Sequence, residues 1–560
     1  MNRKLYLPLL MAVVLAFTSC SKKMGELNAN YFTVTPQPLV AVGGQVPATI
    51  NGTFPEKYFE KKSVVTVTPV LVYAGGEAVG TPFVYQGEKV TGNDQTISYK
   101  MGGNITMKTS FKFIPEMRKS ELYLNFSVQR GKKTYTLPRV KVADGVVATS
   151  ALASAEDVNA AIAPDKFQRI ITDNYVAKIL FLIQQSNLRN NQLNSTEMND
   201  VKAKMKEAHA AENQRVAGIN VAGTASPDGG LELNTNLAEA REKNTVKYME
   251  RTLKKDKVLS DITAEFTPED WAGFKELVEK SNIQDKDLIL RVLSMYQDPA
   301  EREKEIKNLS AAFTQLAEEI LPQLRYSKVT ASIETIGKSD EEIAALAAND
   351  PKALTVEELL YAATLAKTNA EKVAIYKKAT EIYPNDYRAY NNIGVINFAE
   401  GKVADATAMF KKAAQVNPSS SEVAMNLGLI DMYNSEFAKA QEAFGKAAGV
   451  PELPAALGTL YTEQGDYQKA VMAFGDTKSN NAAVAQICAG DYNSAKNTLA
   501  AIANKDALTY YLMAVVGART NNENMVSSNL KEAVKLDPAM AQLALTDIEF
   551  AKYNVANWVK

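Results

Sequence analysis

The sequence predicts a multidomain protein with a strand-rich N-terminal domain, a central α/β domain and a C-terminal array of paired helices. Alternating β-branched stretches separated by glycines occupy residues 31–148. A strand, a glycine turn and a long helix follow one another in residues 219–253. Beyond residue 353, glycine, alanine and aromatic positions recur at intervals of 30 to 34 residues. A chain of 560 residues is also too long for a single hydrophobic core.

The composition argues against several classes of function. Lys and Arg total 63 and Asp and Glu total 64, so the formal net charge of −1 does not favour nucleic acid as a partner. One His and two Cys leave almost no residues for a metal centre, and no nucleophile elbow or Walker loop occurs. We therefore expect no enzymatic activity, no cofactor and no metal. His209 is expected on a solvated helix face, and Cys488 as a small buried apolar side chain.

Residues 1–20 predict an export signal. Basic Arg3 and Lys4 precede an apolar run that ends at Phe17 and is too short to span a bilayer. The next residues, Thr18-Ser19-Cys20, resemble a bacterial lipobox, although Phe17 stands where Leu is preferred. The resemblance implies cleavage before Cys20 and a lipid on its sulfur. A plain secretory signal followed by an unrelated Cys is the alternative.

The residues after Cys20 bear on localisation. They read Ser21-Lys22-Lys23 and are basic, whereas surface-displayed lipoproteins of Bacteroidota usually carry an acidic cluster there. This comparison implies an outer-membrane lipoprotein, anchored in the inner leaflet and facing the periplasm.

Residues 21–148 are expected to form a β-sandwich of the immunoglobulin-like type. Residues 63–73, 105–114 and 121–128 show alternation, and glycine pairs punctuate them. Such a domain serves as a spacer between the lipid and the later domains, or it binds a partner. The Ala- and Ser-rich residues 149–166 predict a linker.

Residues 167–337 predict an α/β domain with a mixed sheet. Strands are expected at 177–188 and 326–336, with a helix at 196–211 and the strand, turn and helix of residues 219–253 between them. A helical insertion is expected at residues 265–321, with helix caps at Thr267 and Asp298. Trp271, on the first of these helices, is expected to pack rather than to stack on a ligand.

The turn in this domain resembles the core motif of OmpA-like periplasmic domains. The matching residues are Gly223, Gly229, Asn234, Leu237 and Arg241. The sequence Gly-x-Ala-Ser-Pro-Asp-Gly at the turn is similar to a variant of this motif that is common in Bacteroidota. In place of the usual Ser of this motif the chain has Ala238. The resemblance implies an OmpA-like α/β sandwich over residues 167–337.

The same resemblance implies a candidate peptidoglycan site. OmpA-like domains hold diaminopimelate between an Asp at the turn and an Arg on the next helix, and Arg241 occupies the position of that Arg. The Asp position holds Ser226, which brings no charge, although Asp228 lies two residues on. Asn234 completes the candidate set. A surface or structural ion pair is the alternative role for Arg241.

Residues 355–538 predict about six helical repeat units. Gly394, Ala406 and Phe410 recur 34 residues on as Gly428, Ala440 and Phe444. This pattern resembles the tetratricopeptide repeat (TPR), which implies an all-α solenoid. Residues 338–354 are expected to form a helical connector, because capping boxes begin at Ser339 and at Thr355, and residues 539–560 are expected to form a capping helix.

The repeats imply a concave surface that binds peptides or protein partners. Its candidate lining residues are Tyr387, Asn391, Asn392, Asn426 and Asp431. The whole chain predicts a non-catalytic outer-membrane lipoprotein scaffold, whose OmpA-like domain docks on peptidoglycan or an envelope complex while the repeats bind a protein complex. The alternative is a structural peptidoglycan tether without a dedicated protein partner.

Overall fold

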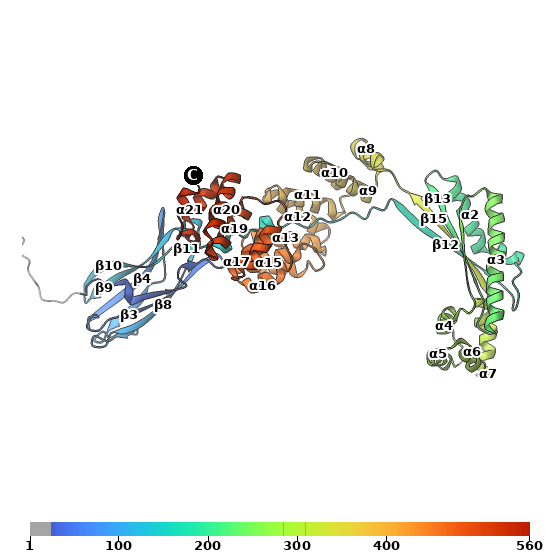
Figure 1. Ribbon diagram of the computed structural model, residues 1–560, viewed down its shortest axis with the longest axis horizontal. Coiled ribbons are helices and arrows are strands. Elements are labelled where there is room, and N and C mark those ends of the chain that lie inside the picture. Colours follow the sequence, from blue (N-terminus) through green and yellow to red (C-terminus); the bar gives the residue numbers. More distant parts are fainter. Residues whose placement is uncertain (1–23, 284, 309, 560) are drawn as a thin grey trace, which may run out of the picture. The chain divides into compact units, whose positions relative to one another are not determined.

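The computed structural model describes residues 24–559 except 284 and 309, and the side chains of residues 310–312 are also left undescribed. The chain forms two compact units. One unit combines the chain up to Pro164 with the chain from Lys367 onward, and the other is Asp165–Ala366 (Figure 1). The predicted signal and Cys20 lie outside the described residues.

The N-terminal part of the first unit contains two main layers around one core, antiparallel except for the β6–β7 pair. One sheet has the order β1-β3-β8, and the other has the order β10-β9-β4-β6-β7, with β5 beside β4. A short parallel pair, β2 and β11, joins the two ends of this part. The strands are β1 Phe32–Thr35, β2 Leu39–Val40, β3 Gln45–Phe54, β4 Ser63–Tyr73, β5 Gly76–Val79, β6 Phe83–Gly87, β7 Gln95–Ile97, β8 Gly103–Lys112, β9 Ser120–Arg130, β10 Lys133–Asp144 and β11 Val146–Val147.

Alternation of side chains explains this core. Along β8, every second residue is buried, and the same holds over most of β4 and β9, as expected for strands with one face on a core. Ile50 and Met107 from the smaller sheet share one cluster with Val65 and Phe126 from the larger sheet. The predicted strand at residues 63–73 is confirmed, and the strands expected at 105–114 and 121–128 are present with boundaries shifted by a few residues.

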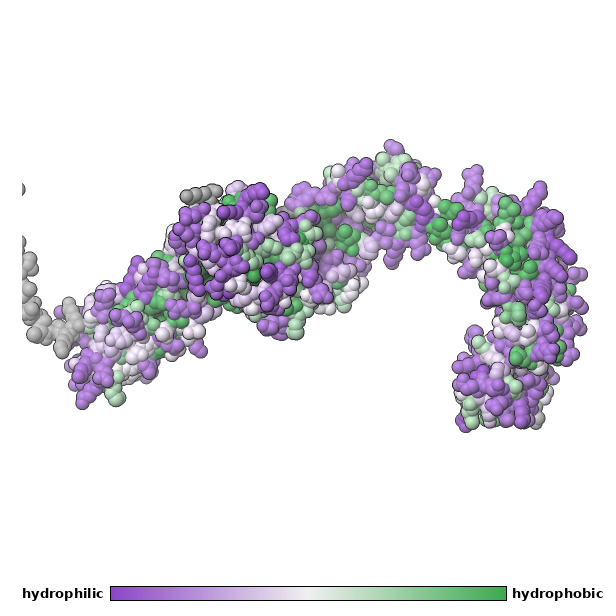
Figure 2. All heavy atoms as spheres, in the orientation of Figure 1, coloured by the Kyte–Doolittle hydropathy of each residue, from purple (hydrophilic) through white to green (hydrophobic). Residues whose placement is uncertain are grey.

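The second unit is built on a four-stranded sheet of order β12-β15-β13-β14. Strand β15 is antiparallel to both neighbours, whereas β13 and β14 are parallel. The helices α2 and α3 pack on one face, where Val201 and Met249 meet Ile179, Val221 and Val329. The elements are β12 Ile170–Leu180, α1 Asn190–Leu193, α2 Thr196–Ala210, β13 Gln214–Thr224, α3 Leu231–Asp256, β14 Ile262–Thr267 and β15 Tyr326–Ile336. The outer face of α3 is hydrophilic (Figure 2).

Two sequence predictions for this sheet are wrong in detail. The first strand ends at Leu180 and does not extend to residue 188, because the chain turns there. The sequence analysis does not predict strand β14, which lies partly inside the predicted insertion. Five of its six side chains are exposed, so its sequence lacks the apolar alternation that marks a strand.

The insertion is a small helical lobe with its own core. Its helices are α4 Trp271–Lys280, α5 Lys286–Met295, α6 Pro299–Asn308 and α7 Ser310–Gln315, followed by single turns over Leu316–Ile320 and Leu321–Leu324. Trp271 packs edge-on against Phe274, with ring centroids 5.7 Å apart, in agreement with its expected packing role. The cap predicted at Thr267 is wrong: Thr267 ends β14, and the Asp270 carboxylate accepts the Gly273 N–H at 2.8 Å instead.

The connector and the first helix of the array are capped as predicted. Helix α8 Asp340–Asn349 and helix α9 Val356–Leu365 both begin with complete capping boxes, Ser339 with Glu342 and Thr355 with Glu358. The cap at Asp298 is confirmed as well, because its carboxylate accepts the Glu301 N–H at 3.0 Å. The boundary between the two units falls just after α9.

From α10 onward the described chain is a run of paired helices. In three successive pairs a glycine of the first helix faces a phenylalanine of the second: a Cβ on Gly394, Gly428 or Gly458 would lie 2.5 Å from a ring atom of Phe410, Phe444 or Phe474. Glycine therefore lets the paired helices approach closely. The helices are α10 Asn369–Ile382, α11 Tyr387–Ala399, α12 Val403–Val416, α13 Ser421–Tyr433, α14 Phe437–Gly445, α15 Leu453–Gln464, α16 Tyr467–Phe474, α17 Asn480–Cys488, α18 Tyr492–Ala501, α19 Ala507–Arg519, α20 Glu523–Leu536 and α21 Ala539–Thr546.

The C-terminal end is closed by more than the predicted capping helix. Helix α21 covers only eight residues, and short turns over Ile548–Phe550 and Val555–Asn557 follow it. Phe550 packs edge-on against Tyr511 of α19, with ring centroids 5.5 Å apart, so this tail belongs to the last core of the array. His209 is exposed on α2 as expected. Cys488 is packed against the same core, and burial raises the pKa of its thiol to about 12.

Candidate functional site

The inner surface of the repeats holds a segment of the chain itself, which begins with a short 3-10 turn over Ala155–Asp157. This segment, Ser154 to Pro164, is named the groove segment here, and it lies inside the stretch predicted as a linker. Asparagines from α11, α13 and α17 bind its backbone: Asn391, Asn392, Asn426 and Asn481, all of them at most 3% exposed.

Three of these asparagines each bind both polar groups of one residue. The side chain of Asn426 accepts the Ala161 N–H at 2.7 Å and donates to the Ala161 carbonyl at 2.8 Å. Asn392 binds both groups of Ala163 in the same way, with two distances of 2.9 Å. Asn481 binds Ser154, accepting its N–H at 3.2 Å and donating to its carbonyl at 2.7 Å.

The asparagines also orient one another. Asn391 donates to the Ala161 carbonyl at 2.9 Å and to Asn392 at 3.1 Å, and its oxygen accepts a hydrogen bond from Asn426 at 2.9 Å. Asn392 and Asn426 lie 34 residues apart, two residues before Gly394 and Gly428, and therefore occupy equivalent places in successive repeats. A network in which each member is hydrogen-bonded holds its side chains in fixed orientations.

Small side chains allow the groove segment to lie deep in the groove between the repeat helices. Ala161 and Ala163 are buried while Ile162 between them is exposed, which is the alternation of an extended chain. Val158 and Ala160 share a core cluster with Met425 and Leu429 of α13. At the far end the guanidinium of Arg388, which is paired with Asp386, donates to the Pro164 carbonyl at 3.4 Å.

The five residues predicted to line the concave surface fall into two groups. Asn391, Asn392 and Asn426 contact the groove segment, as described above. Tyr387 lies against α13, where its hydroxyl is 3.4 Å from Glu422, and Asp431 is partly buried, with a pKa raised by burial and by Glu436. No hydrogen bond between these two side chains and the groove segment is recorded among the described residues. Sequence reasoning missed Asn481 and Arg388, because nothing in the repeat pattern distinguishes them.

The turn of the α/β domain brings Ser226 and Asp228 together around a cation that the sequence analysis missed. Arg325, which directly precedes β15, donates to the Ser226 hydroxyl at 3.0 Å and to the Asp228 carboxylate at 2.9 Å. The Ser226 hydroxyl also donates to Asp228. Asn234 donates to the Gly229 carbonyl at 2.7 Å and so holds the turn. The charge of Asp228 is therefore already compensated within the chain.

Arg241 lies in the interior, with 1% of the residue exposed. Its guanidinium donates to three backbone carbonyls, those of Thr224 at 2.8 Å, Gln185 at 3.0 Å and Leu182 at 3.4 Å. Burial and the nearby charge of Arg325 lower its pKa to about 10, which still leaves it charged at neutral pH. Its contacts fasten the 182–185 turn to α3 and β13, and peptidoglycan binding by this residue stays a prediction.

The described residues hold neither a metal-binding cluster nor a membrane-spanning helix. No group of three or more His, Cys, Asp and Glu side chains there is arranged to hold a metal ion. None of the helices in the described part of the chain combines the length and the apolar character needed to cross a membrane.

One family model matches part of the C-terminal helices. The tetratricopeptide repeat model matches residues 387–420. Among solved structures, a tetratricopeptide repeat protein from Parabacteroides merdae is 14% identical, with 37% of this chain and 91% of that chain covered and a TM-score of 0.30. YrrB, described as a TPR protein with an unusual peptide-binding site, is 21% identical, with 32% and 98% covered and a TM-score of 0.24.

The Cut9–Hcn1 hetero-tetramer of the APC/C is 15% identical, with 57% of this chain and 77% of that chain covered and a TM-score of 0.32. No curated protein matches the chain. The matched repeat places a tetratricopeptide region in the C-terminal helices, and such repeats indicate a role in protein–protein interaction.

Proposed function

We propose that this chain is a non-catalytic scaffold of the bacterial outer membrane. In this proposal a lipid on Cys20 anchors it, the protein faces the periplasm, the Ig-like domain acts as a spacer, and the OmpA-like domain and the repeats dock on an envelope complex. The signal and lipobox pattern support the anchor. The sheet order β12-β15-β13-β14, with two helices on one face, supports an OmpA-like domain.

The observation that carries the proposal is the asparagine network in the groove. It binds backbone atoms of the groove segment, which follows the strands of residues 32–147 (the β domain) after one short turn, so the repeats hold the spacer in a fixed arrangement within one compact unit. A scaffold needs such fixed connections between its modules. Partners of the repeats then bind outside the occupied groove, or they displace the groove segment.

The enclosed position of Arg241 bears on the choice between a protein partner and peptidoglycan. Binding diaminopimelate through Arg241 would require breaking three hydrogen bonds to carbonyls, and Asp228 would have to leave Arg325. We therefore favour docking on an envelope protein complex over the alternative of a structural peptidoglycan tether.

Affinity purification after cross-linking tests the proposal. Cells carrying the tagged chain are cross-linked, the envelopes are solubilised, and the co-purified proteins are identified by mass spectrometry. We expect an outer-membrane complex that is absent from an untagged control and reduced by Cys20→Ala, which removes the lipid. Recovery of the chain alone would contradict the scaffold.

Sedimentation with purified sacculi separates the two alternatives. We expect no retention of the purified chain on sacculi beyond that of an unrelated periplasmic protein. Retention that an Arg241 substitution such as Arg241→Lys weakens, without a change in thermal unfolding, would instead support the tether.

A further inference from the structure

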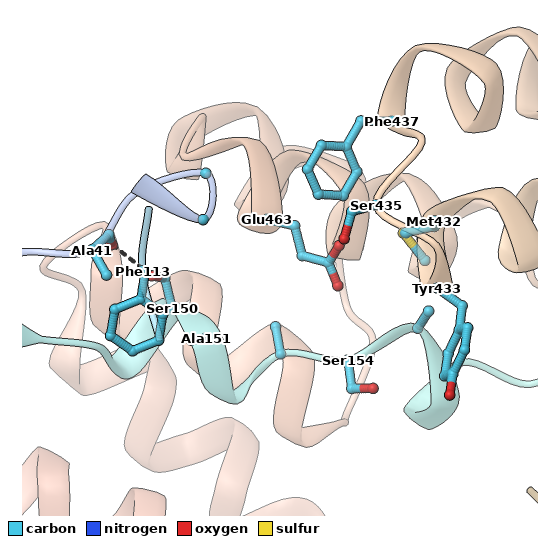
Figure 3. Close-up of a pocket in the computed structure, with 14 residues that line it drawn as sticks. Ala41, Phe113, Ser150, Ala151, Ser154, Met432, Tyr433, Ser435, Phe437 and Glu463 are labelled. Atoms are coloured by element: carbon cyan, nitrogen blue, oxygen red, sulfur yellow. Dashed lines mark hydrogen bonds between the residues drawn. The ribbon is translucent and has the colours of Figure 1, made fainter. Parts of the chain in front are cut away.

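A cavity of about 300 Å³ opens where the groove segment enters the repeats. Its walls come from three parts of the first unit: the hairpin at Gly43 and Gly44 of the β domain, residues 150–155, and the repeats at residues 432–437 and Glu463 (Figure 3). It is named the Glu463 cavity here. None of the asparagines that bind the groove segment lines it, so it is distinct from the backbone-binding network.

The walls of the Glu463 cavity are fixed by close contacts. The Ser150 hydroxyl donates to the buried Ala41 carbonyl at 2.8 Å. Gly465, which ends α15 at a φ of +83°, packs against Val42, and a Cβ at this position would lie 2.1 Å from the Val42 side chain. The cavity is therefore present before any ligand arrives, as most small-molecule sites are.

Glu463 has no partner of its own within the part of the chain that the structure describes. No hydrogen bond or ion pair to its carboxylate is recorded there, and its side chain extends toward Ser435 (Figure 3). All residues that line the cavity are described, and Glu463 is the only acidic or basic one among them; Tyr433 is the only other titratable one. Burial alone raises the pKa of Glu463 to about 7, because no nearby cation counters the loss of solvent.

The rest of the lining suits a cation with an apolar stem. The Ser435 hydroxyl adds an acceptor beside Glu463, whereas the Ser154 hydroxyl already accepts the Glu156 N–H at 3.1 Å. The rings of Phe437, Tyr433 and Phe113 add apolar surface with negative faces. An ammonium group has three donors that can reach separate acceptors, whereas a guanidinium prefers the two oxygens of one carboxylate side by side.

We propose that the Glu463 cavity binds a primary ammonium group at the end of an unbranched aliphatic chain. The carboxylate of Glu463 accepts a charge-assisted hydrogen bond from it, the neighbouring Ser435 hydroxyl accepts a further bond, and the aromatic rings contact the methylene groups. The ammonium comes from a lysine side chain of a partner protein or from a free amine. Because the β domain, residues 150–155 and the repeats all contribute walls, the bound ligand stabilises their association.

Methyl NMR of the full-length chain tests this site. The probes are Nα-acetyl-lysine amide, butylamine and the uncharged Nα-acetyl-norleucine amide, each titrated into protein with ¹³C-labelled methionine methyl groups. Met432 lines the cavity, and its resonance is assigned by its loss in Met432→Leu. Met295, which is exposed in the other unit, serves as an internal reference.

We expect the Met432 resonance to shift with at least one of the two ammonium probes and not with the norleucine derivative. A shift with the lysine derivative assigns the site to a protein partner, and a shift with butylamine alone assigns it to a free amine. In Glu463→Gln the dissociation constant should rise about tenfold or more, because a charge-assisted hydrogen bond is lost.

The pH dependence supplies a second readout. Binding needs the carboxylate form of Glu463, so affinity should increase from pH 6 to pH 8 in the wild type and stay level in Glu463→Gln. Equal shifts with the norleucine derivative, equal affinity in Glu463→Gln, or no shift of Met432 with either ammonium probe overturns the proposal.

Discussion

Asn426 in α13 forms two hydrogen bonds with Ala161 in the groove segment, 265 residues away in the sequence. Its side-chain amide accepts the Ala161 N–H at 2.7 Å and donates to the Ala161 carbonyl at 2.8 Å. Both residues are buried. The pair shows that the repeats recognise the backbone of their occupant, and that this occupant belongs to the same chain.

Asn426→Ala should destabilise the first unit by roughly 2–4 kcal/mol, because it leaves the buried Ala161 N–H and one side-chain oxygen without partners. Asn524→Ala is the matched control, since Asn524 is exposed on α20, and it should change stability by at most about 0.5 kcal/mol. Urea unfolding followed by circular dichroism measures both changes. Similar midpoints for the two variants would contradict this role of Asn426.

Gly428→Ala should destabilise the array by about 1–3 kcal/mol, because the new methyl would meet the Phe444 ring at 2.5 Å and force the paired helices apart. Gly445→Ala, at the end of the same repeat, meets nothing within 4 Å and should be neutral or slightly stabilising. Thermal unfolding compares the two. A Gly428→Ala variant as stable as Gly445→Ala would show that close helix approach is not what this glycine provides.

Glu463→Gln should stabilise the first unit at pH 8 and have little effect at pH 5. Burial raises the pKa of Glu463 from 4.5 to about 7 in the folded state, so its protonated form is favoured there. Its contribution to stability is fully present below about pH 4.5 and is lost as the pH rises through about 7. The expected gain at pH 8 is on the order of 1–3 kcal/mol. Urea unfolding at both pH values checks it, and an equal effect of the substitution at pH 5 and pH 8 would be inconsistent with a partly buried, titrating Glu463.

Arg241→Lys should destabilise the second unit by roughly 2–4 kcal/mol, because a lysine cannot reach three carbonyls at once with a planar fork of donors. Arg215→Lys is the control: Arg215 pairs with Glu334 at the surface, and its substitution should change stability by about 1 kcal/mol or less. Differential scanning calorimetry compares them. If Arg241→Lys left unfolding unchanged but weakened binding to sacculi, a binding role for Arg241 would replace the structural one.

Local signals in the sequence predicted much of the fold. The strand at residues 63–73 and the capping boxes at Ser339 and Thr355 are confirmed, because each is fixed by residues close in the chain. Gly394 and Phe410 also lie close in the chain, and their spacing indicates a pair of closely packed helices. Strand β14 was not predicted because its exposed side chains show no apolar alternation.

The candidate sites were less predictable, because they depend on contacts between distant residues. The asparagines bind backbone atoms, so the groove segment needs only small side chains. A stretch rich in Ala and Ser is equally typical of a linker, so the sequence does not distinguish the two. Arg325 lies 97 residues from Asp228, and no local pattern connects them. The placement of Glu463 beside a β-domain hairpin likewise follows only from the folded chain.

Amide hydrogen exchange of the groove segment tests the central claim most directly. In the full-length chain, the amides of Ala161 and Ala163 should exchange as slowly as the helices of the repeats, because both donate to buried asparagines. Asn426→Ala should release the Ala161 amide. Exchange of these two amides at the rate of an unstructured peptide in the wild-type chain would show that the groove is empty in solution and would contradict the account.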